Sequence, residues 1–212
     1  MKRTIIYHIG LALLLLGTGC ARKAVQHSYY LIEAPAVPDS AALDIAPLVA
    51  ASCEILPVQI HPAFASERIA LRVRTHEISY YAYHKWAVNP EDVLIQLLES
   101  GLQERRIFST VTARLWKLLP DYQLQLYVHR LEVLQQGGRL YAHLDLAFSL
   151  SDNASRQVVV YHAADKRVAL RERDLNLFAG AVSELFHRAL TDFSAKSIHY
   201  FNNKAAQTPQ QP

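Results

Sequence analysis

Apolar and polar residues alternate over much of this chain, which is the pattern of strands that bury one face of a sheet. The alternation is clearest in two segments, "YQLQLYVHRLEVL" at 122–134 and "RLYAHLDLAFSL" at 139–150. Gly137 and Gly138 stand between them, and a glycine pair is favoured in tight hairpin turns. The sequence therefore predicts a long antiparallel hairpin in the centre of the chain.

A two-residue turn fixes the pairing of the two hairpin strands. It sets Leu131 opposite Leu144 and His129 opposite Leu146. Apolar residues nearer the start of the first strand then fall on the opposite face: Leu124, Leu126 and Val128. Either this strand is covered on both faces, or a bulge near Arg130 changes its phase, and the sequence leaves both options open.

Shorter elements precede and follow this hairpin. Strands are expected within 29–33, 53–60, 68–74, 77–86, 107–113 and 156–163. Helical spacing of apolar residues begins after Asn89, a predicted N-cap followed by Pro90, and again after Asp174. This order predicts the α/β class: a single-domain sandwich in which a mixed, mostly antiparallel sheet packs against helices.

The first residues have the layout of a secretory signal peptide. Lys2 and Arg3 precede an apolar run that ends at Leu16, and small residues follow. The run is shorter than the roughly 20 residues that a helix needs to cross a bilayer. A cleaved signal is therefore favoured over a permanent membrane span.

The end of this segment, "GTGC", resembles a bacterial lipobox. Cleavage would fall between Gly19 and Cys20, and Cys20 would carry the lipid, although Gly17 stands where leucine is usual. Three acyl chains would hold the protein on a membrane, because each buried methylene contributes about 0.8 kcal/mol. Residue 21 is alanine, not the aspartate of the inner-membrane retention signal. By resemblance to enterobacterial sorting rules, the destination is the periplasmic face of the outer membrane.

These features divide the chain into four parts. We expect a lipoprotein signal peptide at 1–19, a lipidated tether at 20–27, one domain at 28–201 and a polar, disordered tail at 202–212. Loss of the signal lowers the basic residues from 22 to 20, against 19 acidic ones. Without a cluster of lysine and arginine, this balance argues against a nucleic-acid partner.

The reactive residues show no catalytic pattern. With Cys20 lipidated, Cys53 has no partner in the chain, which excludes a disulfide framework and predicts a buried, inert thiol. The ten histidines are scattered singly and are expected at ordinary strand or surface positions. Four carboxylates have no evident pairing and are expected to be solvated or in surface ion pairs: Asp92, Glu132, Asp145 and Glu172. We therefore expect no enzyme activity, no metal and no cofactor.

Four aromatic residues within seven positions stand out in "YYAYHKW", which starts at Tyr80. Core packing is expected for Tyr80 and Trp86. Alternation directs Tyr81 and Tyr83 away from Tyr80, and tyrosine is enriched at protein interfaces. Tyr81 and Tyr83 are therefore candidate partner-binding residues.

Three further stretches follow in a recognisable order: "YYLIEAP", "ILPVQIHPAFASERIALRV" and "WAVNPEDVLIQLLESGL". With the lipobox, they resemble the ABC-type transport auxiliary lipoproteins, the PqiC-like family, whose recurrent motifs are Y-x-L, P-x-x-L-x-R-x-x-I and W-A-x-x-P. The middle motif departs from the family pattern in "IHPAFASERI", at Phe64 and Glu67.

The resemblance implies an α/β sandwich and a non-enzymatic role beside a transporter. The partner would be an MCE-domain protein of an ABC transporter that moves phospholipid or another hydrophobic solute between the membranes. Some members of the family form rings, so a homo-oligomer is an open expectation. The alternative is a lipoprotein that regulates another envelope machine, such as a cell-wall synthase or a secretion pore.

Overall fold

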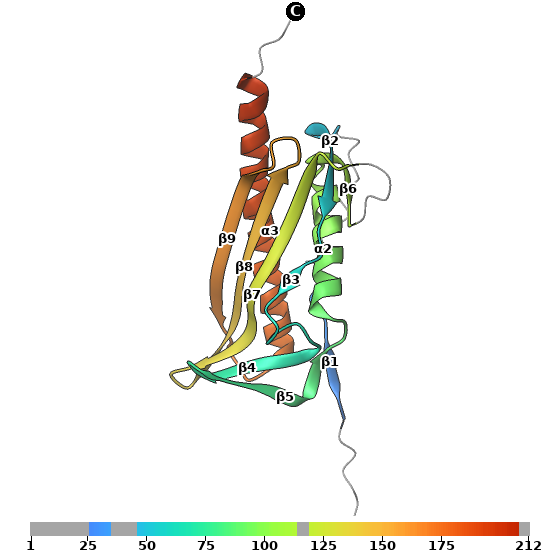
Figure 1. The fold of residues 1–212 in the computed structure, drawn as a ribbon. Coiled ribbons are helices and arrows are strands. Elements are labelled where there is room, and N and C mark those ends of the chain that lie inside the picture. Colours follow the sequence, from blue (N-terminus) through green and yellow to red (C-terminus); the bar gives the residue numbers. More distant parts are fainter. Residues whose placement is uncertain (1–25, 35–45, 114–118, 208–212) are drawn as a thin grey trace, which may run out of the picture.

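Nine strands form one sheet in the part of the chain that the computed structural model describes, residues 26–34, 46–113 and 119–207 (Figure 1). The strands are β1 (Ser28–Tyr30), β2 (Val49–Ile55), β3 (Gln59–Ile60), β4 (Arg68–Arg74), β5 (Glu77–Trp86), β6 (Phe108–Thr112), β7 (Tyr122–Gln136), β8 (Arg139–Asp152) and β9 (Gln157–Ala169). The helices are α2 (Pro90–Glu104) and α3 (Leu175–Gln207). The predicted α/β fold class is confirmed.

Strand β7 organises the sheet because it is long enough to meet several partners in turn. On one side it pairs in parallel with β2, then β3, then β4, and on the other side it pairs with β8 along its whole length. The longer ladders, β7–β8 and β8–β9, are antiparallel, as is β4–β5. The remaining strand pairs, β1–β5 and β2–β6, are short and parallel. The sheet is thus mixed, and most of its paired residues lie in antiparallel ladders, as the sequence predicts.

The central hairpin contains the bulge that the sequence left as one of two options. Leu131 faces Leu144 as predicted, but the register shifts between Val128 and Arg130. Val128 therefore faces Leu146, and the predicted pairing of His129 with Leu146 is wrong by one residue. The shift returns the earlier apolar side chains to the face that the later ones share, and all of them are buried: Leu124, Leu126, Val128, Leu131 and Val133. It also leaves Glu132 on the opposite face, beside His143.

Both helices begin at the predicted caps. The Asn89 side chain accepts a hydrogen bond from the backbone N–H of Glu91 at 3.1 Å, and the Asp174 side chain accepts one from Asn176 at 2.8 Å. Each bond satisfies a backbone donor that the first turn of a helix leaves without a partner. Helix α3 continues to Gln207, so residues 202–207, expected in the polar tail, form its last turns.

The core lies between the sheet and the two helices. Helix α3 packs on β8 and β9, and α2 packs on β2 and β6 (Figure 1). Phe148 stacks on Phe193 with ring centroids 5.0 Å apart, and Trp86 meets Phe178 at 5.5 Å. Cys53 is fully buried, and burial raises its pKa to about 12, which keeps the thiol protonated. The prediction of a buried cysteine is confirmed.

One core histidine, His162, has no polar partner among the described residues. It stacks on Phe148, and neither of its ring nitrogens has a hydrogen-bond partner there. Burial lowers its pKa below the ordinary 6.5, and the positive charge of Lys196 adds to the effect. The fold therefore favours the neutral form of His162 at neutral pH.

Across the described ranges, neither helix combines the length and the apolar character that a membrane span requires.

Candidate functional site

Aromatic side chains gather where β1 lies along β5 at one edge of the sheet. Ser28 stands opposite His84 in this parallel pair, which brings His27 beside Tyr83. Their rings meet edge to face, with centroids 5.8 Å apart. Tyr29 is 62% exposed and Tyr83 is 49% exposed. We call His27, Tyr29, Tyr81 and Tyr83 the aromatic edge.

The two tyrosines singled out from the sequence differ in exposure. Tyr83 presents about half of its surface, whereas Tyr81 is half-buried and meets the ring of His84 edge to face at 5.8 Å. Burial raises the pKa of Tyr81 more than the nearby charge of Arg173 lowers it. The hydroxyl of Tyr30 lies 2.8 Å from Nδ1 of His84, a bond that ties β1 to β5. The aromatic edge is thus a fixed surface on which Tyr29 and Tyr83 are the most accessible tyrosines.

The other two aromatics of this stretch have structural partners. Trp86 is buried against α3, and the core role expected for it is confirmed. Tyr80 is half-buried: its hydroxyl donates to the carbonyl oxygen of Ala63 at 3.0 Å, and the Arg68 guanidinium lies 4.1 Å above its ring. Tyr80 therefore fixes the loop before β4 and does not belong to the aromatic edge.

Gly19 and Cys20, the predicted cleavage site and lipid attachment site, lie outside the described residues. Cys20 precedes His27 by seven positions in the sequence. An extended chain of that length spans at most about 25 Å. If Cys20 is lipidated, His27 at the start of the aromatic edge cannot lie further than this from the anchored residue.

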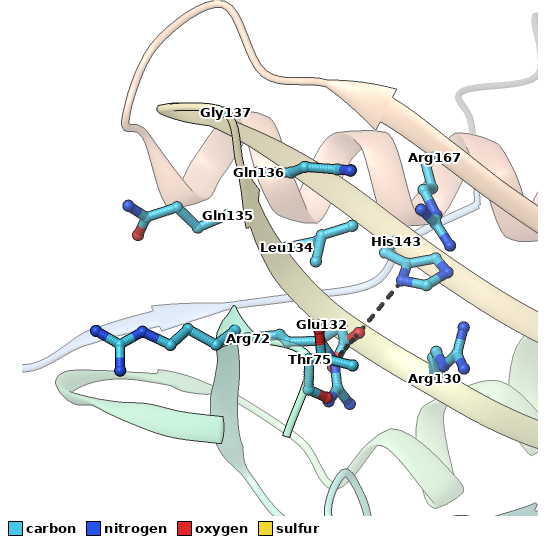
Figure 2. A pocket seen from close by; sticks show the side chains of 11 residues that line it. Arg72, Thr75, Arg130, Glu132, Leu134, Gln135, Gln136, Gly137, His143 and Arg167 are labelled. Carbon is cyan, nitrogen blue, oxygen red and sulfur yellow. Dashed lines mark hydrogen bonds and ion pairs between the residues drawn. The ribbon is translucent and has the colours of Figure 1, made fainter. Parts of the chain in front are cut away.

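A second feature lies on the face of β7 and β8 that is turned away from α3. A hollow of about 490 Å³ opens where the β4–β5 hairpin meets the turn between β7 and β8 (Figure 2). The charged residues of its lining lie on β4, β7, β8 and β9: Arg72, Arg74, Arg130, Glu132, His143 and Arg167. The β7 bulge and strand alternation place Glu132 and His143 on this face, away from α3.

A line of charged groups crosses four strands beside this hollow. The buried carboxylate of Glu132 on β7 accepts two contacts from Nε of Arg72 on β4, at 2.8 and 2.9 Å. Nδ1 of His143 on β8 lies 3.2 Å from the same carboxylate, and its Nε2 lies 2.8 Å from Asp165 on β9. The expectation that Glu132 is solvated or in a surface ion pair is wrong, because neighbouring strands cover it completely.

These contacts set the charge states of the carboxylates. Burial raises the pKa of Glu132, but hydrogen bonds from His143 and Arg72 outweigh it, and the net pKa lies below the ordinary value. The pKa of Asp165 is lowered in the same way, by His143 and by the positive charges of Arg167 and Arg130. Both carboxylates are therefore ionised at neutral pH.

This arrangement is unsuited to acid–base catalysis. Both ring nitrogens of His143 contact carboxylates, and the side chain is buried, so neither nitrogen is free to take a proton from a substrate. Within the described ranges, no three histidine, cysteine or acidic side chains are grouped so that they could hold a metal ion. The described residues instead form exposed surfaces for binding and pairs of opposite charges.

This line of charges was not predicted from the sequence, although part of its signal is present there. The two-residue turn that pairs Leu131 with Leu144 also pairs Glu132 with His143, a cross-strand acid–base pair. The contacts to Arg72 and Asp165 depend on how β4 and β9 join the hairpin, which local sequence patterns do not specify.

Comparisons with known proteins agree with the fold. A protein from Xanthomonas campestris, described under the family model DUF330, has a TM-score of 0.69 at 19% identity; the match covers 85% of this chain and 100% of that one. An uncharacterized protein of known structure has a TM-score of 0.63 at 10% identity, covering 80% and 97%. A hypothetical protein from Chlamydia trachomatis has a TM-score of 0.53 at 8% identity, covering 72% and 98%. At these identities the likeness establishes the fold alone.

None of the curated proteins matches the chain. A family model, by contrast, matches residues 30–193, which is most of the chain and nearly all of the described sheet and helices. It describes the ABC-type transport auxiliary lipoprotein component, the family that the sequence motifs resemble. This chain belongs to the ABC-type transport auxiliary lipoprotein component family.

Proposed function

We propose that this protein is an auxiliary lipoprotein that docks an MCE-type ABC transporter at the periplasmic face of the outer membrane. In this role it supports the transport of phospholipid or another hydrophobic solute between the membranes. The family supports a place beside an ABC-type transporter. The "GTGC" stretch supports a lipid anchor at Cys20. The proposed role is binding and not catalysis, which agrees with the engagement of both ring nitrogens of the buried His143 by carboxylates.

The aromatic edge is the docking surface in this proposal, and its exposure is the observation that carries it. Tyr29 and Tyr83 present large apolar areas with a polar tip, the residue type enriched at interface centres. The bond between Tyr30 and His84 fixes the two strands that carry them. A fixed surface loses little conformational freedom on binding, which favours affinity.

Copurification of the full chain with an MCE-domain protein of the same organism, in nonionic detergent, tests the docking surface. We expect Tyr81→Ala combined with Tyr83→Ala to weaken binding by about tenfold or more, the effect of truncating interface anchors. Tyr161→Ala is the matched control, because Tyr161 is 58% exposed on β9, outside the aromatic edge. Equal binding by the double variant and the wild type would contradict the assignment of this surface.

The anchor has a separate test. Mass spectrometry of the mature protein should find Cys20 as the first residue, with a diacylglycerol thioether and an acylated amine. Cys20→Ser should release the protein from the outer-membrane fraction. A mature chain that starts elsewhere with an unmodified thiol would remove the anchor from the proposal.

A further inference from the structure

The hollow on the sheet face turned away from α3 has more positive charge in its lining than the carboxylate of Glu132 neutralises. Of its four arginines, Arg72 is bound to Glu132, and Arg74 lies 3.5 Å from Glu77 in an exposed pair. The guanidinium groups of Arg130 and Arg167 make no hydrogen bond or ion pair within the described part of the chain. Two guanidinium groups in the lining are thus available to a ligand.

Two further carboxylates, Asp165 and Asp145, stand near these arginines but outside the lining. Asp165 contacts His143, and the charges of Arg130 and Arg167 help to lower its pKa, which places both arginines in the field of one carboxylate. Asp145 stands opposite Arg130 and Asp165 in the strand ladders. Figure 2 shows Arg130 and Arg167 on either side of His143, facing the hollow from β7 and β9.

Neutral hydrogen-bonding groups complete the lining. Thr75, Gln135 and Gln136 border the same space, and its volume of about 490 Å³ falls within the roughly 300–1,000 Å³ of small-ligand pockets. The planar guanidinium group donates two parallel hydrogen bonds to a phosphate, which suits Arg for phosphate recognition. We propose that Arg130 and Arg167 form a binding site for a phosphate-type anion, either a free phosphate compound or the headgroup of a phospholipid.

This site is independent of the proposed docking surface. The aromatic edge lies on β1 and β5, whereas both guanidinium groups come from β7 and β9. The docking double variant, with Tyr81 and Tyr83 replaced, should therefore bind anions as the wild type does. Failure of one proposal would leave the other standing.

The experiment is calorimetric titration of the full chain in nonionic detergent at constant ionic strength. The probes are inorganic phosphate, glycerol 3-phosphate and monomeric dihexanoyl phosphatidylglycerol. We expect Arg130→Gln combined with Arg167→Gln to weaken binding by about tenfold or more, because hydrogen bonds to charged groups are strong. The control, Arg156→Gln with Arg171→Gln, removes the same charge from exposed positions outside the hollow and should bind like the wild type.

The probes separate the two sources of the anion. Tighter binding of dihexanoyl phosphatidylglycerol than of both soluble phosphates indicates a lipid headgroup, and the reverse order indicates a soluble compound. In the wild type, the Nε–H NMR signals of Arg130 and Arg167 should also shift on addition of the tightest probe, a readout that needs no variant. Absence of binding by all three probes, or equal weakening in the control variant, would overturn the proposal.

Discussion

Replacement of Arg72 by methionine is the sharpest test of the line of charges. Methionine keeps much of the apolar stem of Arg72 but removes the guanidinium that contacts both oxygens of Glu132. The Glu132 side chain is completely covered in the wild type, so its charge depends on the side chains that contact it. The variant therefore leaves a buried carboxylate with His143 as its remaining partner.

The expected cost follows from burial. Removal of one partner from a buried ion pair destabilises a protein by about 3–5 kcal/mol. Arg72 is 20% exposed and His143 keeps its contact, which lowers the expected loss to about 2–4 kcal/mol. Addition of Glu132→Met to Arg72→Met should recover part of this loss, because it removes the buried charge.

Urea unfolding at neutral pH, followed by circular dichroism, measures these differences. The matched control is Arg74→Met, because Arg74 forms an exposed pair with Glu77 and should change stability by less than about 0.5 kcal/mol. A cost of Arg72→Met no larger than that of Arg74→Met would show that the guanidinium of Arg72 does not offset the buried charge of Glu132. A double variant with Glu132→Met that is less stable than Arg72→Met alone would contradict the same assignment.

The loss of stability caused by Arg72→Met should depend on pH, in a direction set by the pKa of Glu132. The folded-state pKa of Glu132 is lowered below the ordinary 4.5, so its stabilisation is present above pH 4.5 and disappears as the pH falls through the folded-state pKa. The difference in stability between the wild type and Arg72→Met should therefore shrink in acid. A difference that stays constant from pH 7 to pH 3 would contradict the assignment.

Four further predictions concern the core and the helix α3. Because the folded-state pKa of His162 lies below 6.5, its burial costs stability as the pH falls below 6.5; His162→Phe should lessen that loss, as measured by thermal melting at pH 7 and pH 5. Cys53, with a pKa of about 12 and no exposure, should resist iodoacetamide at pH 8 in the folded protein and react in urea, as mapped by mass spectrometry. Gly101→Ala would place Cβ 2.7 Å from a methyl of Leu190 and should cost about 1–3 kcal/mol in urea unfolding. Gly180→Ala, with open space around its Cβ, should instead stabilise α3 by about 0.5–1 kcal/mol.

The N-cap predictions succeeded because capping depends on neighbours in the chain. Asn89 and Asp174 bond to backbone groups two positions away, so their role is readable without the rest of the fold. The hairpin register succeeded for the same reason, since the glycine pair at the turn fixes the pairing near it. The error at His129 begins where the bulge interrupts that register.

The exposure of the aromatic edge needed the structure. Alternation along β5 assigns Tyr81 and Tyr83 to the same face, yet Tyr83 is exposed and Tyr81 is half-buried. The β4–β5 ladder shifts register between Arg68 and Ala70, so β5 is irregular between Tyr80 and Lys85, and Tyr81 packs against the core and the ring of His84. A period of two predicts a face but says nothing of what a distant segment covers.

The class of fold, the helix starts, the turn of the long hairpin and the family motifs can be read from the amino-acid sequence, because each depends on residues close together in the chain. The bulge that resolves the phase of β7 and the burial of Glu132 among charges became visible in the folded chain. Arg72 and Glu132 are 60 positions apart, and they meet because β4 joins β7 in parallel. The pairing of strands distant in sequence is set by the burial of the whole sheet against its helices, which no local pattern contains.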